Sequence, residues 1–283
     1  MTLTFVRPTR ELTPYIDAIW VFESAIGLPA DENNGAPPNG CSKLTFAYGS
    51  SFDSIANGRA MTRPERRLNF VGTRDDGISL HSDRRPMGCI GIEFRPHGAF
   101  PVFGIPMGET VNFLGDADSV LGTWAREVEE VLNTQHSVDQ RVASLQERIT
   151  RQLRSNRLNA RGRKQERHHE LVAYCVRALE STHGRLTIRE LERRSGYSRR
   201  YLELLFKQHV GLSPKVLAGI MRFQRFYRGW AQGLSFDVVR DDLYEYFYDQ
   251  SHFIREFQRI TGHPPGEYFQ YGRNEFGQRR VLR

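Results

Sequence analysis

One helical segment occurs twice in this chain, and the duplication restricts the possible folds more than any other feature. The first copy reads YSRRYLELLFKQHVGLSP over residues 197–214, and the second reads FYDQSHFIREFQRITGHPP over residues 247–265. They align without gaps at a distance of 51 residues. The main matched pairs are Ser198 with Asp249, Leu202 with Phe253, Phe206 with Phe257, Gly211 with Gly262 and Pro214 with Pro265. Two copies do not make a repeat array, so the pattern predicts a pair of like supersecondary units.

Each copy carries the start and stop signals of a short helix. Ser198 and Asp249 are N-cap residues, whose side chains accept a hydrogen bond from the free N–H groups of a first helical turn. Apolar residues four positions apart predict one buried stripe per helix, and a glycine followed by proline ends each helix. Before the first copy, a short helix containing Ile188 and Leu191 leads into the turn SGYS, which is the pattern of a helix-turn-helix. Residues 216–230 predict a longer helix that connects the two units.

The charge is unevenly distributed along the chain. Of a formal net charge of +7, residues 156–283 hold 24 Lys and Arg against 14 Asp and Glu, whereas residues 1–155 hold 16 against 19. An excess of positive charge in the half that carries the duplication favours a polyanionic partner, most often nucleic acid. The alternative is a basic face that only interacts with solvent.

The N-terminal half shows the pattern of a β-rich domain, because residues 12–105 contain short alternating apolar runs between Gly, Pro, Asn and Asp clusters. Three runs are each predicted to place their apolar residues on one face of a strand: Ile16, Ala18, Trp20 and Phe22; Leu44, Phe46 and Tyr48; and Ile90, Ile92 and Phe94. From Asp118 the period becomes helical. Two stripes predict amphipathic helices: Trp124, Val128 and Val131, then Val142, Leu145, Ile149 and Leu153.

The predicted fold class is therefore α+β and multidomain, with a β-rich part followed by helices and then an all-α part. The expected divisions are a β-rich regulatory domain over residues 1–117, linking helices over 118–153, a basic linker over 154–167, a domain with two helix-turn-helix units over 168–272, and a tail over 273–283. The linker assignment depends on RSNRLNARGRKQER being polar, basic and almost free of apolar residues.

The C-terminal part resembles the AraC-type transcriptional regulators. The resemblance is carried by LERRSGYSRRYLELLFKQHVGLSPK in the first unit and YDQSHFIREFQRITGHPP in the second. It implies two helix-turn-helix units joined by one long helix, control of transcription, and RNA polymerase as a partner. The N-terminal PYIDAIWVFE, PNGCSKLTFAYG and IGIEFRPHGAFPVFGIP are similar to the β-rich domain that precedes some of these regulators. The chain departs from the family pattern at Glu192 and Asp242, where small residues are usual, and at Tyr246, where a glycine usually makes the turn.

The outer faces of the duplicated helices supply the candidate DNA-binding residues. The second helix of such a unit enters the major groove with its N-terminal residues at the base edges, where Arg binds guanine, Gln suits adenine and apolar groups contact the thymine methyl. The candidates in the first copy are Ser198, Arg199, Arg200, Glu203, Leu204 and Lys207, and those in the second are Gln250, Ser251, Ile254, Arg255 and Arg259. Gln258 and Arg259 are expected at phosphates.

Other chemistry has little support in the sequence. No metal is expected, because the nine histidines lack the spacing of converging ligands. Cys41, Cys89 and Cys175 are too far apart for a CxxC pattern, so neither a disulfide framework nor a zinc site is indicated. No GxGxxG, GxSxG or Walker motif occurs, so we expect no enzyme and no cofactor. Without a run of 18 or more apolar residues or an N-terminal apolar h-region, we expect a cytoplasmic protein with no membrane partner.

These observations predict a sequence-specific regulator of transcription that binds double-stranded DNA in two successive major grooves. The alternatives are an architectural protein that binds DNA without sequence choice, and a metal-dependent sensor or enzyme that a basic domain only anchors. The N-terminal aromatic residues suggest a small-molecule effector, with Trp20, Phe46, Phe94 and Arg95 as candidate contacts and a filled core as the alternative. The two helical stripes over 118–153 suggest a homodimer.

Overall fold

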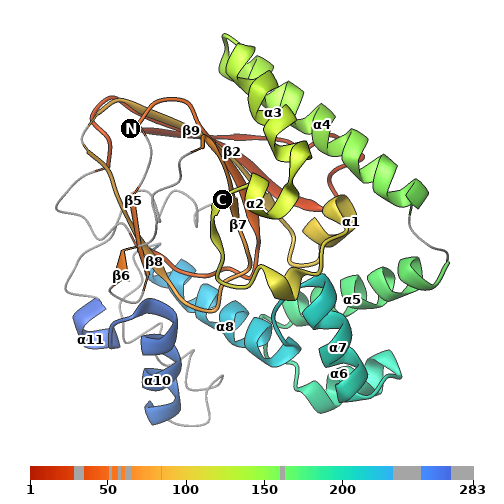
Figure 1. Cartoon of the computed structure of the whole chain (residues 1–283). Helices are drawn as coiled ribbons and strands as arrows, with labels where there is room; N and C mark the ends of the chain where they lie inside the picture. Colours follow the sequence, from red (N-terminus) through yellow and green to blue (C-terminus); the bar gives the residue numbers. More distant parts are fainter. Residues whose placement is uncertain are drawn as a thin grey trace.

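Strands of alternating polarity and two amphipathic helices build the N-terminal part, and a chain of helices follows it (Figure 1). The computed structural model describes residues 1–28, 35–50, 53–56, 59–60, 66–83, 85–159, 163–231 and 250–268. The predicted fold class is confirmed: antiparallel sheets come first, then helices, then a helical C-terminal part.

Two antiparallel sheets form the N-terminal part. The larger has the strand order β1 (Thr2–Val6), β2 (Ile16–Ser24), β9 (Met87–Phe94), β4 (Lys43–Ala47), β7 (Leu68–Val71) and β10 (Leu114–Asp116). The smaller has the order β3 (Gly35–Ala36), β8 (Ile78–His81), β5 (Asp53–Ala56) and β6 (Arg59–Ala60). At the centre of the larger sheet, β9 pairs with β2 on one side and β4 on the other, which explains why all eight of its residues are buried.

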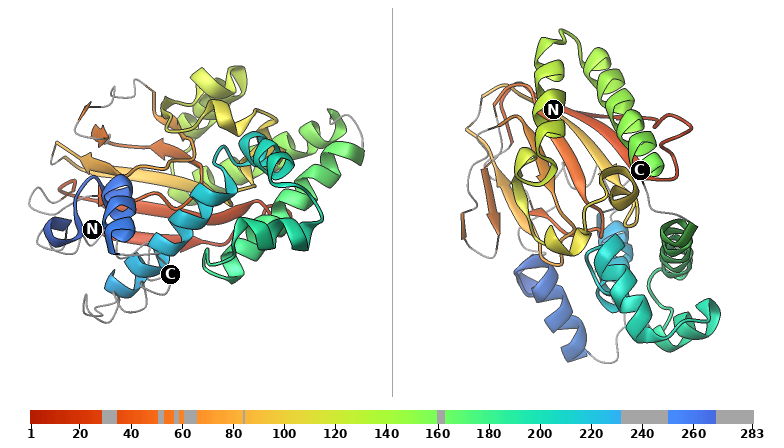
Figure 2. Two further views of the ribbon diagram at one scale, coloured as in Figure 1. Left: turned by 90° about the horizontal axis from the view of Figure 1, so that it is seen from below. Right: turned by 45° about the vertical axis from the view of Figure 1, so that its right-hand side comes forward.

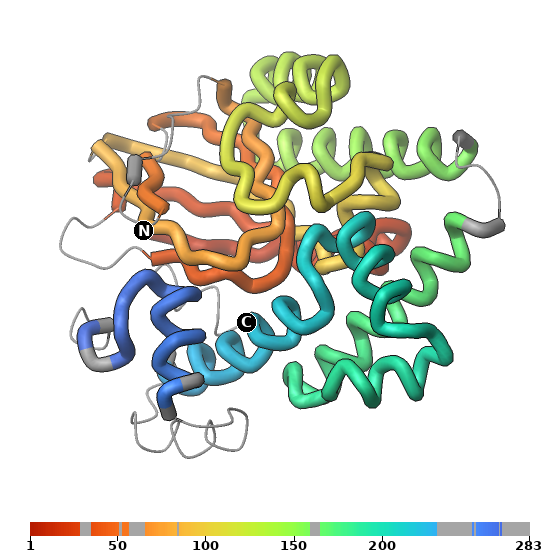
Figure 3. The backbone as a smooth tube through the Cα atoms, turned by 60° about the horizontal axis from the view of Figure 1, so that its bottom comes forward, coloured from red at the N-terminus to blue at the C-terminus, as the bar shows by residue number. Residues whose placement is uncertain are grey.

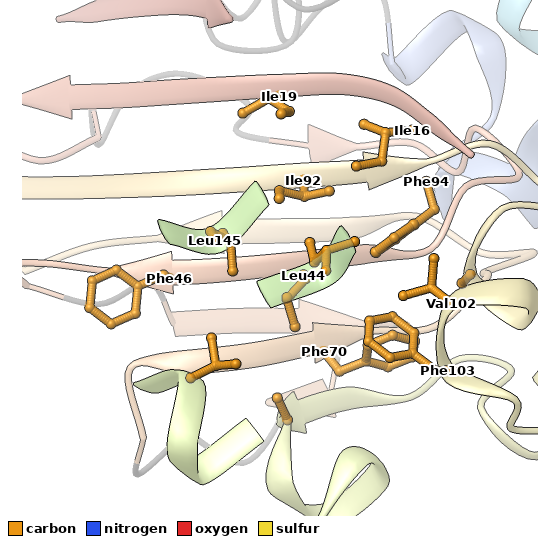
Figure 4. Close-up of a cluster of buried hydrophobic side chains, with 14 of the residues drawn as sticks. Ile16, Ile19, Leu44, Phe46, Phe70, Ile92, Phe94, Val102, Phe103 and Leu145 are labelled. Atoms are coloured by element: carbon orange, nitrogen blue, oxygen red, sulfur yellow. The ribbon is translucent and has the colours of Figure 1, made fainter. Parts of the chain in front are cut away.

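One face of the larger sheet carries the main core. Helices α1 (Ala99–Phe103), α3 (Thr123–Thr134) and α4 (Val138–Asn159) pack against it, and the short α2 (Asp118–Leu121) leads into α3. Figure 4 shows side chains of the central strands facing those of α1 and α4, among them Ile92, Phe94, Phe103 and Leu145. The predicted alternation in β4 and β9 is thereby confirmed, because Leu44, Phe46, Ile90, Ile92 and Phe94 share this core.

The predicted single face of β2 is wrong at its first residue. Ile16 packs in the main core, whereas Ala18, Trp20 and Phe22 pack in a separate cluster on the opposite face of the sheet. The pairing of β2 with β9 shifts between Ile16 and Ala18. A bulge inserts one extra residue and so reverses the alternation of side chains on either side of it.

The helical stripes of α3 and α4 face the sheet of their own chain. Val128, Leu145, Ile149 and Leu153 are buried in the main core, and Trp124 packs against it. The length of these stripes was the reason to expect a homodimer. The sheet covers these stripes, so their length no longer argues for a second copy of the chain. The homodimer stays a prediction that the two helices do not support.

The segment predicted as a polar linker is helical where the structure describes it. Helix α4 continues to Asn159, and α5 (Arg163–Ser181) begins before His168. Polar residues at the end of α4 contact the N-terminal part: Arg154 pairs with Glu11, Asn156 donates to the Pro101 carbonyl at 3.1 Å, and Arg157 donates to the Tyr15 hydroxyl at 2.5 Å. These long-range partners explain why a stretch with so few apolar residues is helical.

The described residues of the C-terminal part include α5, α6 (Ile188–Ser195), α7 (Arg199–His209), α8 (Pro214–Ala231), α10 (Gln250–Thr261) and α11 (Pro265–Tyr268). Helix α8 lies between α7 and α10, as the two views of Figure 2 and the tube in Figure 3 show. Its first half packs with α7 through Leu217 and Ile220, and its second half packs with α10 through Phe223 and Phe226. The predicted connecting helix therefore exists.

In the described ranges, no helix has both the length and the apolar character needed to cross a bilayer. Nor do those residues include a group of three or more His, Cys, Asp or Glu side chains arranged to hold a metal ion. All three cysteines are buried free thiols.

Candidate nucleic-acid interface

The first helix-turn-helix unit is built by local capping. Thr187 and Glu190 form a capping box at the start of α6, which ends at Gly196 with a left-handed φ of 76°. Ser198 then caps α7, its side chain accepting from the Tyr201 N–H. Helix, glycine turn and capped second helix agree with the sequence-based prediction.

Glu192, one of the departures from the family pattern, has a structural role at this turn. Its Oε1 accepts a hydrogen bond from the Arg199 N–H at 2.5 Å. The carboxylate thus joins Ser198 at the N-terminus of α7, where the free N–H groups favour negative charge. The two departures in the second unit, Asp242 and Tyr246, fall outside the described residues.

The outer face of α7 presents the predicted residues to solvent. Leu202, Leu205 and Phe206 are buried on the inner face, and Arg199, Arg200, Leu204 and Lys207 are exposed, with Glu203 partly so. Leu204 is 62% exposed on this face, so its side chain is accessible to a ligand.

The two neighbouring arginines of α7 differ in their contacts. Arg199 Nε donates to Glu203 Oε1 at 2.8 Å, which ties it to its own helix. Within the described part of the chain, Arg200 makes no hydrogen bond or ion pair, and it points away from the core as an exposed side chain. A guanidinium group without an internal partner is available to a ligand without first breaking a contact.

The second copy, α10, also has a buried and an exposed face. Phe253, Phe257 and Ile260 are buried, and Ser251, Ile254 and Arg255 are exposed. Gln250 is the first residue of the helix, but its side chain lies outside the description. Gly262, with φ of 80°, follows the helix as Gly211, with φ of 90°, follows α7.

Arg259 is a candidate whose side chain hydrogen-bonds to the N-terminal part. Its Nη1 donates to the Asp75 carbonyl at 2.8 Å and its Nη2 to Glu256 Oε2 at 3.0 Å. A phosphate contact from Arg259 would therefore require the bond to Asp75 to break.

The far end of α7 packs against the N-terminal part. The Thr73 hydroxyl donates to the Val210 carbonyl at 2.9 Å in a buried contact. Next to it, the short 3₁₀ helix Met107–Glu109 lies against Lys207: a Cβ added to Gly108 would lie 2.9 Å from the Lys207 carbonyl oxygen. The N-terminal half of α7 is thus exposed, and its C-terminal end packs against the N-terminal part.

The four candidate effector contacts do not share one site. Phe46 and Phe94 are fully buried in the main core, and the Arg95 side chain lies at the surface, donating to the Thr13 carbonyl. Trp20 lines a cavity of about 100 Å³ on the opposite face of the sheet. The structure brings Lys43, Asn69, Arg74 and two cysteines to the same cavity.

Burial decides the charge state of the two cavity thiols. It raises the pKa of Cys41 well above its usual range and that of Cys89 to about 12, so both stay neutral. The Lys43 ammonium lies 3.1 Å from Asn39 Oδ1 and 4.0 Å from Glu93 Oε2. Apart from Trp20, these residues were missed in the sequence, because strands far apart in the chain bring them together and no local pattern marks them.

Comparison with known families finds one match in each part of the chain. A family model described as a helix-turn-helix domain (HTH_18) matches residues 191–271. Another, described as a domain of unknown function (DUF6597), matches residues 4–114. No curated protein sequence matches the chain.

Two solved structures of ToxT from Vibrio cholerae are similar in outline. ToxT from strain O395 is 11% identical with a TM-score of 0.44, and an apo lysine-to-alanine variant from strain SCE256 is 12% identical with a TM-score of 0.43. Each comparison covers 89% of this chain and 97% of the other. The match of residues 191–271 to a helix-turn-helix domain family agrees with the capped helix-turn-helix that the structure contains.

Proposed function

We propose that this protein is a sequence-specific, DNA-binding regulator of transcription of the AraC type, which contacts bases in two successive major grooves with α7 and α10 as its recognition helices. The observation that carries the proposal is Arg200, which is exposed near the N-terminus of α7 and makes no hydrogen bond or ion pair with the described residues. Base contacts form at this end of the helix in such units. Arg255 is exposed at the first turns of α10. Because both helices pack on α8, one chain offers both to neighbouring grooves, which are about 34 Å apart along one face of DNA.

Selection from a pool of random duplexes tests this function. We expect the full chain to enrich a site with two conserved blocks whose centres are about 10 base pairs apart. An architectural protein would give a different result: no sequence would be enriched, and random competitor DNA would displace the chain equally well from every duplex. Metal analysis of the purified protein tests the other alternative, a metal-dependent sensor or enzyme.

The N-terminal cavity supports a small-molecule effector as the second part of the proposal. The cavity wall includes Pro38, whose carbonyl accepts a hydrogen bond from Gln224 of α8 at 2.7 Å. A ligand that moves this wall therefore reaches the helix that joins the two units. Regulation follows if the ligand binds two arrangements of the chain with different affinity. RNA polymerase, as the family implies, is the partner we propose for the DNA-bound protein.

Filling the cavity should abolish the response to an effector. Ala47 is buried and lines the cavity, so we expect Ala47→Leu to exclude the ligand while the exposed faces of α7 and α10 stay unchanged. Native mass spectrometry of the full chain purified from cells is the measurement, with the parent retaining a small molecule and the variant losing it. Thr13→Ala, in an exposed loop, is the control. Equal retention by parent and variant would place the ligand elsewhere.

A further inference from the structure

Three imidazoles from separate elements meet where the N-terminal part contacts the C-terminal helices. His97 lies in the turn after β9, His169 in α5, and His209 is the last residue of α7. The ring centroids of His97 and His169 are 5.5 Å apart, and those of His169 and His209 are 6.1 Å apart. We call these three residues the histidine cluster.

Aromatic residues of the N-terminal part enclose the cluster. Phe100 of α1 lies 4.1 Å from His209 between ring centroids, and Tyr15 stacks on His169 at 5.9 Å. The turn that carries His97 is fixed by its neighbours: the Arg95 N–H donates to the Tyr15 carbonyl at 2.8 Å, and a Cβ added to Gly98 would lie 1.9 Å from that carbonyl oxygen. The cluster therefore belongs to a defined contact between domains.

Buried nitrogen atoms of the cluster have no hydrogen-bond partner. His97 is 5% exposed and His209 is fully buried. Among the described residues, nothing pairs with Nδ1 of His97, Nδ1 of His169 or either ring nitrogen of His209. A buried polar atom without a partner is costly, so a cluster with four of them is an unusual way to fill an interface.

The charged groups around the cluster are mostly cationic. Arg95 and Arg177 act on His97, Arg157 and Arg177 act on His169, and His168 acts on His209. Two acidic groups act on the same arginines: Asp17 lies 3.6 Å from Arg95 Nη1, and Glu180 of α5 interacts with Arg95 and Arg177. Burial is the main cause that lowers the pKa of His97 and His209 to about 3 and that of His169 to about 4; next come His169 for His97 and His209, and Arg157 for His169.

We propose that the histidine cluster is a proton-sensitive latch, which holds the end of α7 on the N-terminal part while its imidazoles are neutral and releases it when they take up protons. In the closed arrangement, protons would place positive charges about 6 Å apart among arginines, with little solvent to screen them. Separation of the two parts exposes the imidazoles to water, where the protonated form is stable.

The direction of the pH response follows from the lowered pKa values. An exposed imidazole has a pKa of about 6.5, and each closed-state pKa lies below that value. The stabilisation of the closed arrangement by the neutral imidazoles is therefore complete above about pH 6.5, and it is lost progressively as the pH falls towards 4. At about pH 5.5 each histidine shifts the equilibrium towards the open arrangement by about tenfold, and three together by about a thousandfold.

Release of the latch would change how α7 meets DNA, since Lys207 and Val210 at its end contact the N-terminal part. That consequence rests on the proposed function, but the latch does not. The latch can be measured without DNA, so its failure and the failure of DNA recognition are separate results.

Hydrogen exchange of the full chain tests the latch. We expect the protection factors of amides in residues 205–212, corrected for the intrinsic effect of pH, to fall by at least a hundredfold between pH 7.5 and pH 5.5. The ratio of the protection factors at pH 7.5 and pH 5.5 should be about tenfold smaller in His209→Gln than in the parent, because one titrating group is gone. His169→Gln, at a less buried position, carries the test if His209→Gln does not fold.

His136→Gln is the matched control, because His136 is exposed and far in sequence from the cluster. It should keep the full pH ratio of the parent. A parent whose protection is the same at both pH values would overturn the latch, as would cluster variants that retain the full ratio. One zinc ion per chain, lost in His169→Gln, would also overturn it, since metal ligation would then be the role of the three imidazoles.

Discussion

Replacing Arg200 by alanine is expected to weaken binding to the selected operator by about 1 to 3 kcal/mol, roughly 5- to 150-fold in Kd, and to relax base preference at one position. The reason is that Arg200 is exposed near the start of α7 and has no partner to lose within the described structure. A bidentate contact to guanine disappears with its side chain. Binding measured against a set of operators, each with a single base change, shows whether the loss is confined to one base pair.

Lys207→Ala is the comparison that separates base recognition from attraction to phosphate. Lys207 is exposed on the same helix, two turns later, beside the contact with the N-terminal part. As a phosphate contact it carries no base identity, so its loss should weaken all sequences alike and reduce the salt dependence of binding by about one charge. If Arg200→Ala binds every sequence as tightly and as selectively as the parent, α7 is not a recognition helix.

Arg255→Ala should have the same kind of effect in the second unit, and we expect it to be smaller than that of Arg200→Ala. Both side chains are exposed on the outer faces of their helices. The second unit, however, begins with the departures at Asp242 and Tyr246, and Arg259 in its recognition helix binds Asp75. Binding of DNA by α10 therefore competes with the contact between Arg259 and Asp75. Among the described residues, Arg200 of α7 makes no such contact.

The sequence was informative where structure is determined locally. The glycine stop, the cap and the apolar stripe that define α7 all lie within about four turns of helix, so their pattern could be recognised in the chain alone. The same holds for the alternation in β4 and β9. A bulge is different, because the shift between Ile16 and Ala18 depends on how β2 pairs with β9 across the sheet.

Structure that depends on distant partners could not be predicted. The end of α4 has the composition of a linker, yet Arg154 binds Glu11, and their positions are far apart in the chain. The cavity beside Trp20 and the histidine cluster have the same origin. His97, His169 and His209 share no motif, and only the packing of α5 and α7 against the N-terminal part brings them together.

The free energy of unfolding should fall by about 3 to 5 kcal/mol in Phe257→Ala, because a large buried ring is lost and a cavity remains. Phe257 is 1% exposed. Its ring centroid lies 5.4 Å from Phe223 and 5.6 Å from Phe226, both on α8, and 5.6 Å from Phe253 on its own helix. Chemical denaturation of the full chain measures the change.

Ile254→Ala is the matched control, since Ile254 lies on the same helix but is 36% exposed, and a surface change of this kind costs within about 0.5 kcal/mol. On DNA the parent is the reference instead, because Ile254 is itself a candidate base contact. With Phe257 removed, α10 loses its packing on α8, so recognition of the second block of the operator should disappear while α7 still selects the first. If recognition of both blocks is lost together, α8 transmits the defect to the first unit. If the free energy of unfolding of Phe257→Ala equals that of the parent, the aromatic contacts do not hold α10 in place.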